Sequence, residues 1–332
     1  MELLKNVSIA EFTSFKIGGK ADYFCRARSV DELKEALAFA RRHSLPIFIL
    51  GGGTNMLLSD DGFRGVVVKI ELHGVKWGEA SVVAAGENWD SFVAETVARG
   101  LWGLENLSGI PGTVGAAPVQ NIGAYGVEIA EVLEWVEALD MRTGEIKQLS
   151  NADCAFAYRD SIFKKQEGKN FIITRVAFRL QKDGAPNLQY KDLAEYFSSG
   201  GAPTLQQIRR AVLEIRARKF PDLKTHGTAG SFFKNPIISK EKFEELKKRF
   251  PGLSGFPVPS GVKVPLAWIL DKICGLKGFE QDNTALWKDQ PLVLVNKGGA
   301  SASAVSALAD NIAHIVKEKT GIEIEREVNF LC

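Results

Sequence analysis

Apolar residues recur at helical spacing in several segments of the chain. The first segment opens with Ser29 and Glu32 in the spacing of a capping box and stops near Pro46, so we expect a helix between them. Its apolar residues are Leu33, Ala36, Leu37 and Ala40. Similar patterns predict helices over 89–99, 205–219 and 301–321 and a helix within 239–249.

Short apolar or β-branched runs predict strands between these helices. They lie at residues 47–50, 65–70, 80–83, 131–149, 170–180, 291–296 and 322–331. A turn at Thr143-Gly144 divides the run at 131–149 into two strands. Because helical and strand patterns alternate without an internal repeat, we predict an α+β protein with a larger unit ending near residue 215.

The two-residue period of the last predicted strand separates acidic from apolar residues. One face carries Glu323, Glu325, Glu327 and Asn329, and the other carries Ile322, Ile324, Val328 and Phe330. From the pattern alone, the acidic face is interpreted as the solvated side of the strand.

Composition narrows the class of protein. A length of 332 residues favours two or three domains. With 42 basic and 40 acidic residues the formal charge is +2, so we expect no nucleic-acid partner, and the local basic segment 215–224 fits one small anionic ligand. Four cysteines without paired spacing predict neither a metal site nor a disulfide framework. The N-terminus lacks the pattern of a signal peptide and no apolar run is long enough to span a membrane, so we expect a cytoplasmic protein.

Two glycine-rich segments are candidate ligand loops. Gly51, Gly52 and Gly53 lead into a strand and not a helix, which argues against a dinucleotide fingerprint, and no Walker-type loop occurs. A structural turn and an anion-binding nest of backbone N–H groups fit this segment equally well. Residues 109–126 hold five glycines and two prolines, which fits either a long ligand or an elaborate structural loop.

Arg159 and Ser231 are candidate catalytic or binding residues whose roles the local sequence does not decide. Arg159 could clamp a carboxylate through two nitrogens or form a surface ion pair with Asp160. Ser231 lies in THGTAGSFFKNP, where Phe233 stands in place of the second glycine of a nucleophile elbow, which argues against a covalent serine. A cap or turn serine is then the plainest interpretation.

Six blocks of sequence, in order, carry a resemblance that runs over nearly the whole chain. They are TSFKIGG (13–19), ILGGGTNMLLSD (49–60), GLENLSGIPGTVGAAPVQNIGAYGVE (103–128), YRDSIFK (158–164), GTAGSFFKNP (227–236) and EREV (325–328). Together they resemble the UDP-N-acetylenolpyruvoylglucosamine reductases, flavoenzymes that complete UDP-N-acetylmuramate in bacterial wall synthesis. Tyr190 resembles the tyrosine of the family's longer-loop class, which closes over the substrate.

The resemblance implies an FAD-binding domain of the vanillyl-alcohol-oxidase/PCMH type with two α/β subdomains, residues 1–69 and 70–215. An α+β substrate domain, residues 216–320, would follow, and the C-terminal strand, 321–332, would return to the first subdomain. FAD would be held without a covalent bond, in keeping with glycine-rich loops that contain neither His nor Cys.

The family's reaction assigns roles to three residues. NADPH is the co-substrate that reduces the flavin, and the enolpyruvyl ether of UDP-N-acetylglucosamine then receives hydride from N5 at its C3 and a proton at its C2. By resemblance, Ser231 donates the proton, and Arg159 and a protonated Glu327 stabilise the charge that moves toward the substrate carboxylate.

Further ligand contacts are implied by the same resemblance. Contacts to the substrate diphosphate are Tyr190, Lys219, Asn235, Gln290 and Arg216. Contacts to FAD are Gly51, Gly52, Gly53, Thr54, Asn55, Gly112, Gly115, Ala116, Ile122 and Gly123. We expect a monomer with no protein partner.

Two other functions stay open. One is a related FAD-dependent oxidase that acts with molecular oxygen on another alcohol or sugar, against which the basic segment 215–224 favours a nucleotide sugar. The other is a nucleotide-sugar-binding regulator without chemistry, against which the catalytic residues argue. The chain also departs from the family pattern at Arg326, where proline is common, and at Asn329, where a basic residue often lies.

Overall fold

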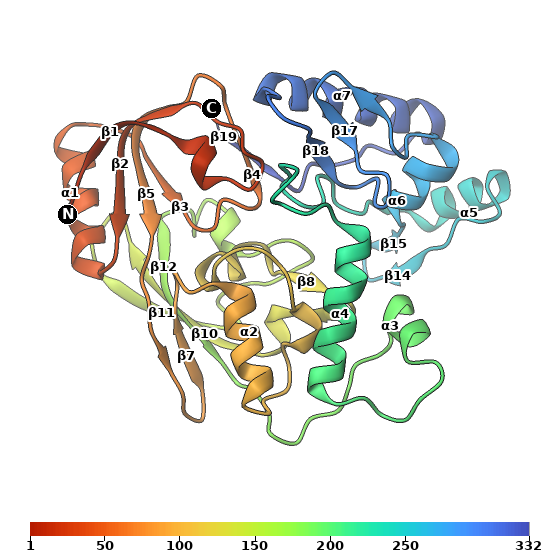
Figure 1. Cartoon of the computed structure of the whole chain (residues 1–332), viewed down its shortest axis with the longest axis horizontal. Helices are drawn as coiled ribbons and strands as arrows, with labels where there is room; N and C mark the ends of the chain where they lie inside the picture. Colours follow the sequence, from red (N-terminus) through yellow and green to blue (C-terminus); the bar gives the residue numbers. More distant parts are fainter. Residues whose placement is uncertain (332) are drawn as a thin grey trace. The chain divides into compact units, whose positions relative to one another are not determined.

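The computed structural model (Figure 1) describes residues 1–331. The chain divides into two compact units. Unit 1 comprises residues 1–7, 21–53 and 64–216, and unit 2 comprises 8–20, 54–63 and the residues from 217 onward. Each unit is therefore assembled from three separate segments of the sequence. The three-part division expected from the family resemblance stays a prediction.

Two sheets form the frame of unit 1. The four-stranded sheet has the order β1 (Leu4–Ser8), β2 (Lys20–Ala27), β5 (Phe63–Ile70), β3 (Ile47–Leu50). The five-stranded sheet has the order β11 (Ile146–Ser150), β10 (Leu133–Asp140), β12 (Phe171–Phe178), β7 (Ser81–Ala84), β6 (Val75–Lys76). Strands β3 and β5 are parallel. Strand β3 ends at Leu50, so the glycines at 51–53 follow its carboxyl end directly.

The helices of this part of the chain are α1 (Val30–Arg42), α2 (Trp89–Ala98), α3 (Lys191–Tyr196) and α4 (Leu205–Lys219). Helix α1 begins at the predicted cap, where Ser29 Oγ accepts a hydrogen bond from Glu32 N at 3.1 Å. The carboxylate of Glu32 accepts from Arg28 N at 2.7 Å, one residue before the position that a full capping box requires. The predicted apolar face of α1 is buried.

The core of unit 1 fixes the amino end of α2. Rings of Trp89, Phe92 and Phe178 pack together, with centroids 5.2–6.4 Å apart. Trp89 also donates its indole N–H to the carbonyl oxygen of Leu107 at 3.0 Å. These contacts attach α2 to the chain that leads into the glycine-rich segment 109–126, which contains 3₁₀ turns and the short hairpin β8 (Gly123–Ala124) and β9 (Val127–Glu128).

Unit 2 combines small sheets with helices. The sheets have the orders β13 (Ile237–Ile238), β15 (Gly261–Lys263), β14 (Phe256–Val258); β16 (Glu280–Gln281), β17 (Thr284–Leu286), β18 (Leu294–Asn296); and β19 (Asn329–Leu331), β4 (Met56–Leu58). The helices are α5 (Lys240–Arg249), α6 (Leu266–Trp268), which continues into a π-helical turn at Ile269–Ile273, and α7 (Ala302–Thr320). None of the helices described in residues 1–331 is long and apolar enough to cross a bilayer.

The strand predicted over 322–331 is mostly wrong. Only β19 at its end is a strand, and it pairs in parallel with β4, placing Phe330 opposite Leu57. The preceding residues follow the chain at 232–234 instead, where Lys234 N donates to the carbonyl oxygen of Glu325 at 2.9 Å. Because the two-residue period is lost there, Glu327 is buried at 9% exposure and does not share a solvated face with Glu325.

Candidate active site

Within unit 2, the segment TSFKIGG packs against GTAGSFF. Ser14 Oγ donates to the carbonyl oxygen of Thr228 at 2.6 Å, and Thr228 N donates to the carbonyl oxygen of Ser14 at 3.0 Å. A Cβ on Gly227 would lie 2.1 Å from the carbonyl oxygen of Phe15, so only glycine fits. The absence of a side chain at Gly227 therefore allows the backbone of Phe15 to approach.

Ser231 follows a turn that another side chain caps. Gly230 adopts a φ of +76°, and its N–H donates to Thr228 Oγ1 at 3.2 Å. Ser231 itself pairs with Val293 in an antiparallel bridge, and Phe232 N donates to the carbonyl oxygen of Leu292 at 2.7 Å. Thr228 thus stabilises this turn, and the interpretation of Ser231 as a cap or turn serine stays untested.

Glu327 lies next to the same segment. Its N–H donates to the carbonyl oxygen of Phe232 at 2.8 Å, and its carbonyl oxygen accepts from Asn55 Nδ2 at 3.3 Å. Phe232 and Phe233 are each 1% exposed and belong to the apolar core of unit 2. Unit 2 therefore brings together the blocks that contain Asn55, Ser231 and Glu327.

The two departures from the family pattern both have structural partners in unit 2. The Arg326 guanidinium lies 2.6 Å from the carboxylate of Asp310 in α7 and donates to the carbonyl oxygen of Ser306 at 3.2 Å. Asn329 N donates to the carbonyl oxygen of Asn55 at 3.1 Å. Both residues hold the C-terminal segment in place.

The candidate diphosphate contacts of unit 2 lie in different elements. Asn235 Oδ1 accepts from Leu266 N at 2.9 Å, at the start of α6, and Lys219 is the last residue of α4. Gln290 lies in a turn closed by Val293 N donating to its carbonyl oxygen at 2.9 Å. Within residues 1–331, the buried Gln290 Oε1 and the buried Nε1 of Trp287 in the same turn have no hydrogen-bond partner. Because such atoms are costly to leave unmatched, they fit contacts to a polar ligand. No pattern in the sequence marks Trp287 as a site residue.

Within unit 1, the two glycine-rich segments meet through their backbones. A Cβ on Gly52 would lie 2.7 Å from Gly112 Cα, and a Cβ on Gly51 would lie 3.0 Å from Thr113 Oγ1. A Cβ on Gly115 would lie 2.5 Å from the Cβ of Ala85. Two glycine-rich loops in close contact are compatible with the pyrophosphate of a dinucleotide, which backbone N–H groups can bind. The residues therefore fit FAD.

Arg159 contacts the end of the second glycine-rich segment. Its guanidinium Nη2 donates to the carbonyl oxygen of Gly123 at 2.8 Å, and its charge lies over the ring of Tyr158 at 5.4 Å. The carboxylate of Asp160 lies 3.5 Å from Lys165 Nζ. Gly123 follows Ile122, whose N–H donates to the carbonyl oxygen of Ala117 at 3.1 Å. A catalytic candidate and two cofactor candidates thus lie together in unit 1.

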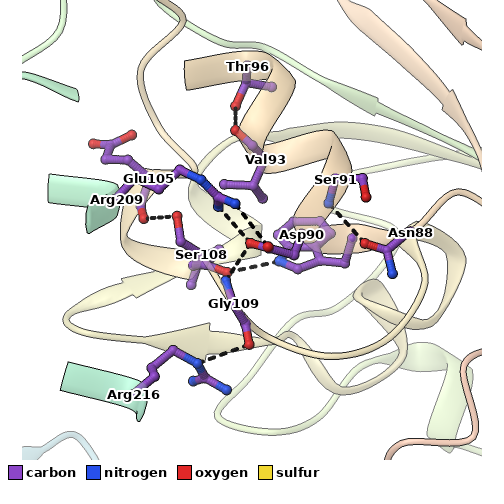
Figure 2. Close-up of polar contacts among 12 residues, drawn as sticks. Asn88, Asp90, Ser91, Val93, Thr96, Glu105, Ser108, Gly109, Arg209 and Arg216 are labelled. Carbon is purple, nitrogen blue, oxygen red and sulfur yellow. Dashed lines mark hydrogen bonds and ion pairs between the residues drawn. The ribbon is translucent and has the colours of Figure 1, made fainter. Parts of the chain in front are cut away.

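Tyr190 and Arg216 both lie near Tyr125, which the sequence did not single out. The Tyr190 ring meets the Tyr125 ring edge-on, with centroids 5.2 Å apart. Burial raises the pKa of Tyr125 to about 12, against the opposing effect of Arg216, which hydrogen-bonds the phenol. Arg216 Nε donates to the carbonyl oxygen of Gly109 at 3.0 Å (Figure 2).

The site residues are shared between the units. Those in unit 1 are Arg159, Tyr190, Arg216, Gly51, Gly52, Gly53, Gly112, Gly115, Ala116, Ile122 and Gly123. Those in unit 2 are Ser231, Glu327, Lys219, Asn235, Gln290, Thr54 and Asn55. That both sets act on one substrate stays a prediction.

Metal-ligating side chains do not gather in the described part of the chain. Residues 1–331 contain no group of three or more His, Cys, Asp or Glu arranged around a common point. Cys25, Cys154 and Cys274 are free and buried. Burial raises the pKa of the Cys25 thiol to about 11, which keeps it protonated near neutral pH.

Two family models match this chain, one over part of unit 1 and one over part of unit 2. Residues 21–150 match a family model described as an FAD binding domain, and residues 222–331 match the C-terminal domain of UDP-N-acetylenolpyruvoylglucosamine reductase. A crystal structure of the UDP-N-acetylenolpyruvylglucosamine reductase from Thermus caldophilus shares the fold, with a TM-score of 0.71 at 24% identity over 100% of this chain and 98% of that one. The predicted α+β class, with an FAD-binding domain ahead of a second domain, is confirmed.

Curated relatives cover the full length. The UDP-N-acetylenolpyruvoylglucosamine reductase of Pseudomonas fluorescens is 42% identical over 99% of both chains. The Pseudomonas aeruginosa enzyme is 41% identical over 99% of both, and the Ralstonia nicotianae enzyme is 42% identical over 96% of both. The chain belongs to the UDP-N-acetylenolpyruvoylglucosamine reductase family.

Proposed function

We propose that this protein is an FAD-dependent oxidoreductase that reduces the enolpyruvyl ether of UDP-N-acetylglucosamine to UDP-N-acetylmuramate in peptidoglycan synthesis. The observation that carries the proposal is the identity of about 42% to reductases of this name over 99% of both chains. The glycine-rich loops that meet through their backbones at Gly52 and Gly112 supply the FAD site, without a covalent attachment. The chemistry that FAD supplies when bound is two-electron transfer, with hydride taken up from NADPH and released from N5 to C3 of the enolpyruvyl group.

Ser231 is the proposed proton donor to C2. Hydride addition at C3 breaks the carbon–carbon double bond and moves its electron pair toward the substrate carboxylate, so C2 must gain one proton to complete the product. A serine hydroxyl is a weak acid, yet it can protonate a basic enolate carbon when its alkoxide is stabilised nearby. The neighbouring Phe232 and Phe233 are each 1% exposed and pack into the apolar core of unit 2, which holds the backbone that carries this hydroxyl.

Arg159 and Glu327 are proposed to stabilise the charge on the substrate carboxylate. The planar guanidinium of Arg159 matches a carboxylate in two parallel hydrogen bonds. The carboxyl group of Glu327 is buried, and in its protonated form it can donate a hydrogen bond to the same charge. Both interactions strengthen as charge develops, so they favour the transition state over bound substrate.

The UDP diphosphate is proposed to contact Tyr190, Lys219, Asn235, Gln290 and Arg216. The unmatched buried Oε1 of Gln290 supports a polar ligand at that turn. Tyr190 is 43% exposed and is the residue immediately before α3, which suits a side chain that closes over the substrate as in the family's longer-loop class. We further propose that the protein acts as a monomer in the cytoplasm and takes NADPH as co-substrate.

A single purification and assay tests the proposed function. The protein should be yellow, with the visible absorption bands of bound flavin, and NADPH oxidation should require the enolpyruvyl UDP-sugar. Product analysis should show one UDP-N-acetylmuramate for each NADPH consumed. A colourless protein, NADPH oxidation that is indifferent to this substrate, or oxygen consumption with another alcohol or sugar would overturn the proposal.

A further inference from the structure

Gly109 begins the glycine-rich segment 109–126, and side chains hold both of its polar backbone groups (Figure 2). Its N–H donates to Asp90 Oδ1 at 2.6 Å, and its carbonyl oxygen accepts from Arg216 Nε at 3.0 Å. Its φ of +71° lies in the region that favours glycine, and an added Cβ would lie 2.8 Å from Leu213 Cδ2, at the end of a flexible side chain. The position of this residue is therefore set by contacts from outside the segment.

Asp90 and Arg209 form a two-bond ion pair between α2 and α4. Arg209 Nη1 lies 2.6 Å from Asp90 Oδ1, and Arg209 Nη2 lies 2.9 Å from Asp90 Oδ2. The Arg209 side chain is only 17% exposed, so water competes weakly for the pair. Burial alone would raise the pKa of Asp90, but hydrogen bonds from Arg209 and Gly109 outweigh burial and lower that pKa.

Arg216 connects the two ends of the same segment. It lies two helical turns after Arg209 on α4, so the two side chains project from one face of the helix. Besides Gly109, Arg216 hydrogen-bonds the phenol of Tyr125, near the end of the segment. Asn106 Nδ2 also donates to the carbonyl oxygen of Tyr125 at 2.9 Å.

We propose that Asp90 and Arg209 are positioning residues for FAD binding. Together with Arg216 they form a loop clamp that fixes both ends of segment 109–126 before FAD arrives. The inference rests on the proposed function, since it takes this segment as part of the FAD site. A segment with five glycines has high conformational entropy when unrestrained, so a preformed conformation raises affinity for the cofactor.

Two adjacent arginines of α4 provide a matched test. Arg209→Gln breaks the pair with Asp90, whereas Arg210→Gln breaks an exposed pair with Glu214, whose separation is 2.9 Å. We expect Arg209→Gln to raise the dissociation constant of FAD at least tenfold, measured by flavin fluorescence on apoprotein, and to change the visible circular dichroism of bound FAD. Arg210→Gln should stay within twofold of wild type on both measurements.

A second variant keeps the test independent of gross folding. Asp90→Asn retains the shape of the side chain and an acceptor for Gly109 N–H but removes the charge. It should raise the dissociation constant of FAD less than Arg209→Gln does. In the double variant, the fold-increase in this constant should be smaller than the product of the two single fold-increases, because both changes break the same interaction. At saturating FAD, kcat of Asp90→Asn should return to near wild type.

Other results overturn the loop clamp. It is wrong if Arg209→Gln and Asp90→Asn melt at lower temperature as apoproteins but bind FAD as wild type does, since the pair would then be merely structural. It is also wrong if Arg210→Gln weakens FAD as much as Arg209→Gln. Wild-type protein that binds no FAD overturns the proposed function together with the clamp, whereas normal wild-type binding with unaffected variants overturns the clamp alone.

Discussion

Ser231 is held through its backbone, which pairs with Val293, so we expect that its hydroxyl can be removed with little change in the fold. In Ser231→Ala, NADPH should still bleach the flavin, because proton transfer to C2 comes after that step. Reoxidation of the reduced enzyme by the enolpyruvyl substrate should slow by about 10²–10⁴-fold, the usual contribution of general acid catalysis. Stopped-flow absorbance of the flavin separates the two half-reactions.

Ser239→Ala is the matched control for that variant. Ser239 Oγ accepts from Lys242 N at 3.2 Å as the N-cap of α5, so its loss should cost about 1 kcal/mol of stability. Both half-reactions should keep their wild-type rates. If Ser231→Ala also turns over normally, the proton comes from another group.

A substitution at Gly52 tests whether the close contact between the two glycine-rich segments shapes the FAD site. Gly52→Ala would place a Cβ 2.7 Å from Gly112 Cα, a distance that forces the backbones apart. The dissociation constant of FAD should rise at least tenfold, as measured by fluorescence titration. Gly200→Ala is the control, because a Cβ at Gly200 meets no atom within 4 Å, and it should leave FAD affinity unchanged. Equal FAD affinity in both variants would show that this contact does not shape the FAD site.

At the scale of elements, the contact between α4 and segment 109–126 makes stability depend on alkaline pH. Burial raises the pKa of Tyr125 from an ordinary value of 10.0 to about 12. The folded state therefore holds a proton that the unfolded chain releases, and stability falls as pH rises from about 10 to about 12. Each pH unit in that window should remove about 1.4 kcal/mol through this group.

Tyr125→Phe should remove the part of the pH dependence of stability that comes from the Tyr125 phenol. The variant loses the hydrogen bond to Arg216, so it should be less stable than wild type near pH 8. Urea unfolding at a series of pH values should show the two proteins converging between pH 10 and 12. Parallel curves across that range would mean that the Tyr125 phenol ionises equally easily in the folded and unfolded states.

Elements with a strong local signal could be predicted from the sequence. The capped helix after Ser29 and the helix over 205–219 form as expected, because cap chemistry and apolar period act within a few residues. The strand over 322–331 could not be predicted, because residues near 232–234, almost a hundred positions earlier, pair with it. Glu327 is buried for the same reason.

The site divides in the same way between local and distant signals. The sequence blocks contain the candidates Ser231 and the glycine loops, yet Asp90 and Tyr125 carry no local signal of function. The role proposed for them depends on Arg209, which pairs with Asp90 in α2, and on Arg216, which contacts Tyr125 in segment 109–126. Both contacts form only when these parts of the chain pack against α4. A seven-residue spacing of arginines was the single available hint, and it is common on solvated helices.

At the scale of the whole molecule, two separate cores are built from segments that interleave along the chain. Phe15 and Ile17, close to the N-terminus, are buried in the core of unit 2 with Phe232, whereas residues 21–53 belong to unit 1. This interleaving of the two units depends on contacts between residues more than 200 positions apart, such as Phe15 and Phe232. Length and composition therefore predict two domains but not where each begins and ends.

Hydrogen exchange of the whole chain can show which unit each ligand stabilises. FAD at a hundredfold excess over its dissociation constant should stabilise the folded state by about 2.7 kcal/mol. Peptides from segment 109–126 in unit 1 should gain the most protection, while peptides from α5 in unit 2 change least. Adding UDP-N-acetylglucosamine to the FAD complex should then protect residues 225–236. Protection by FAD that is equal in α5 and in segment 109–126 would contradict an FAD site built on the glycine-rich loops.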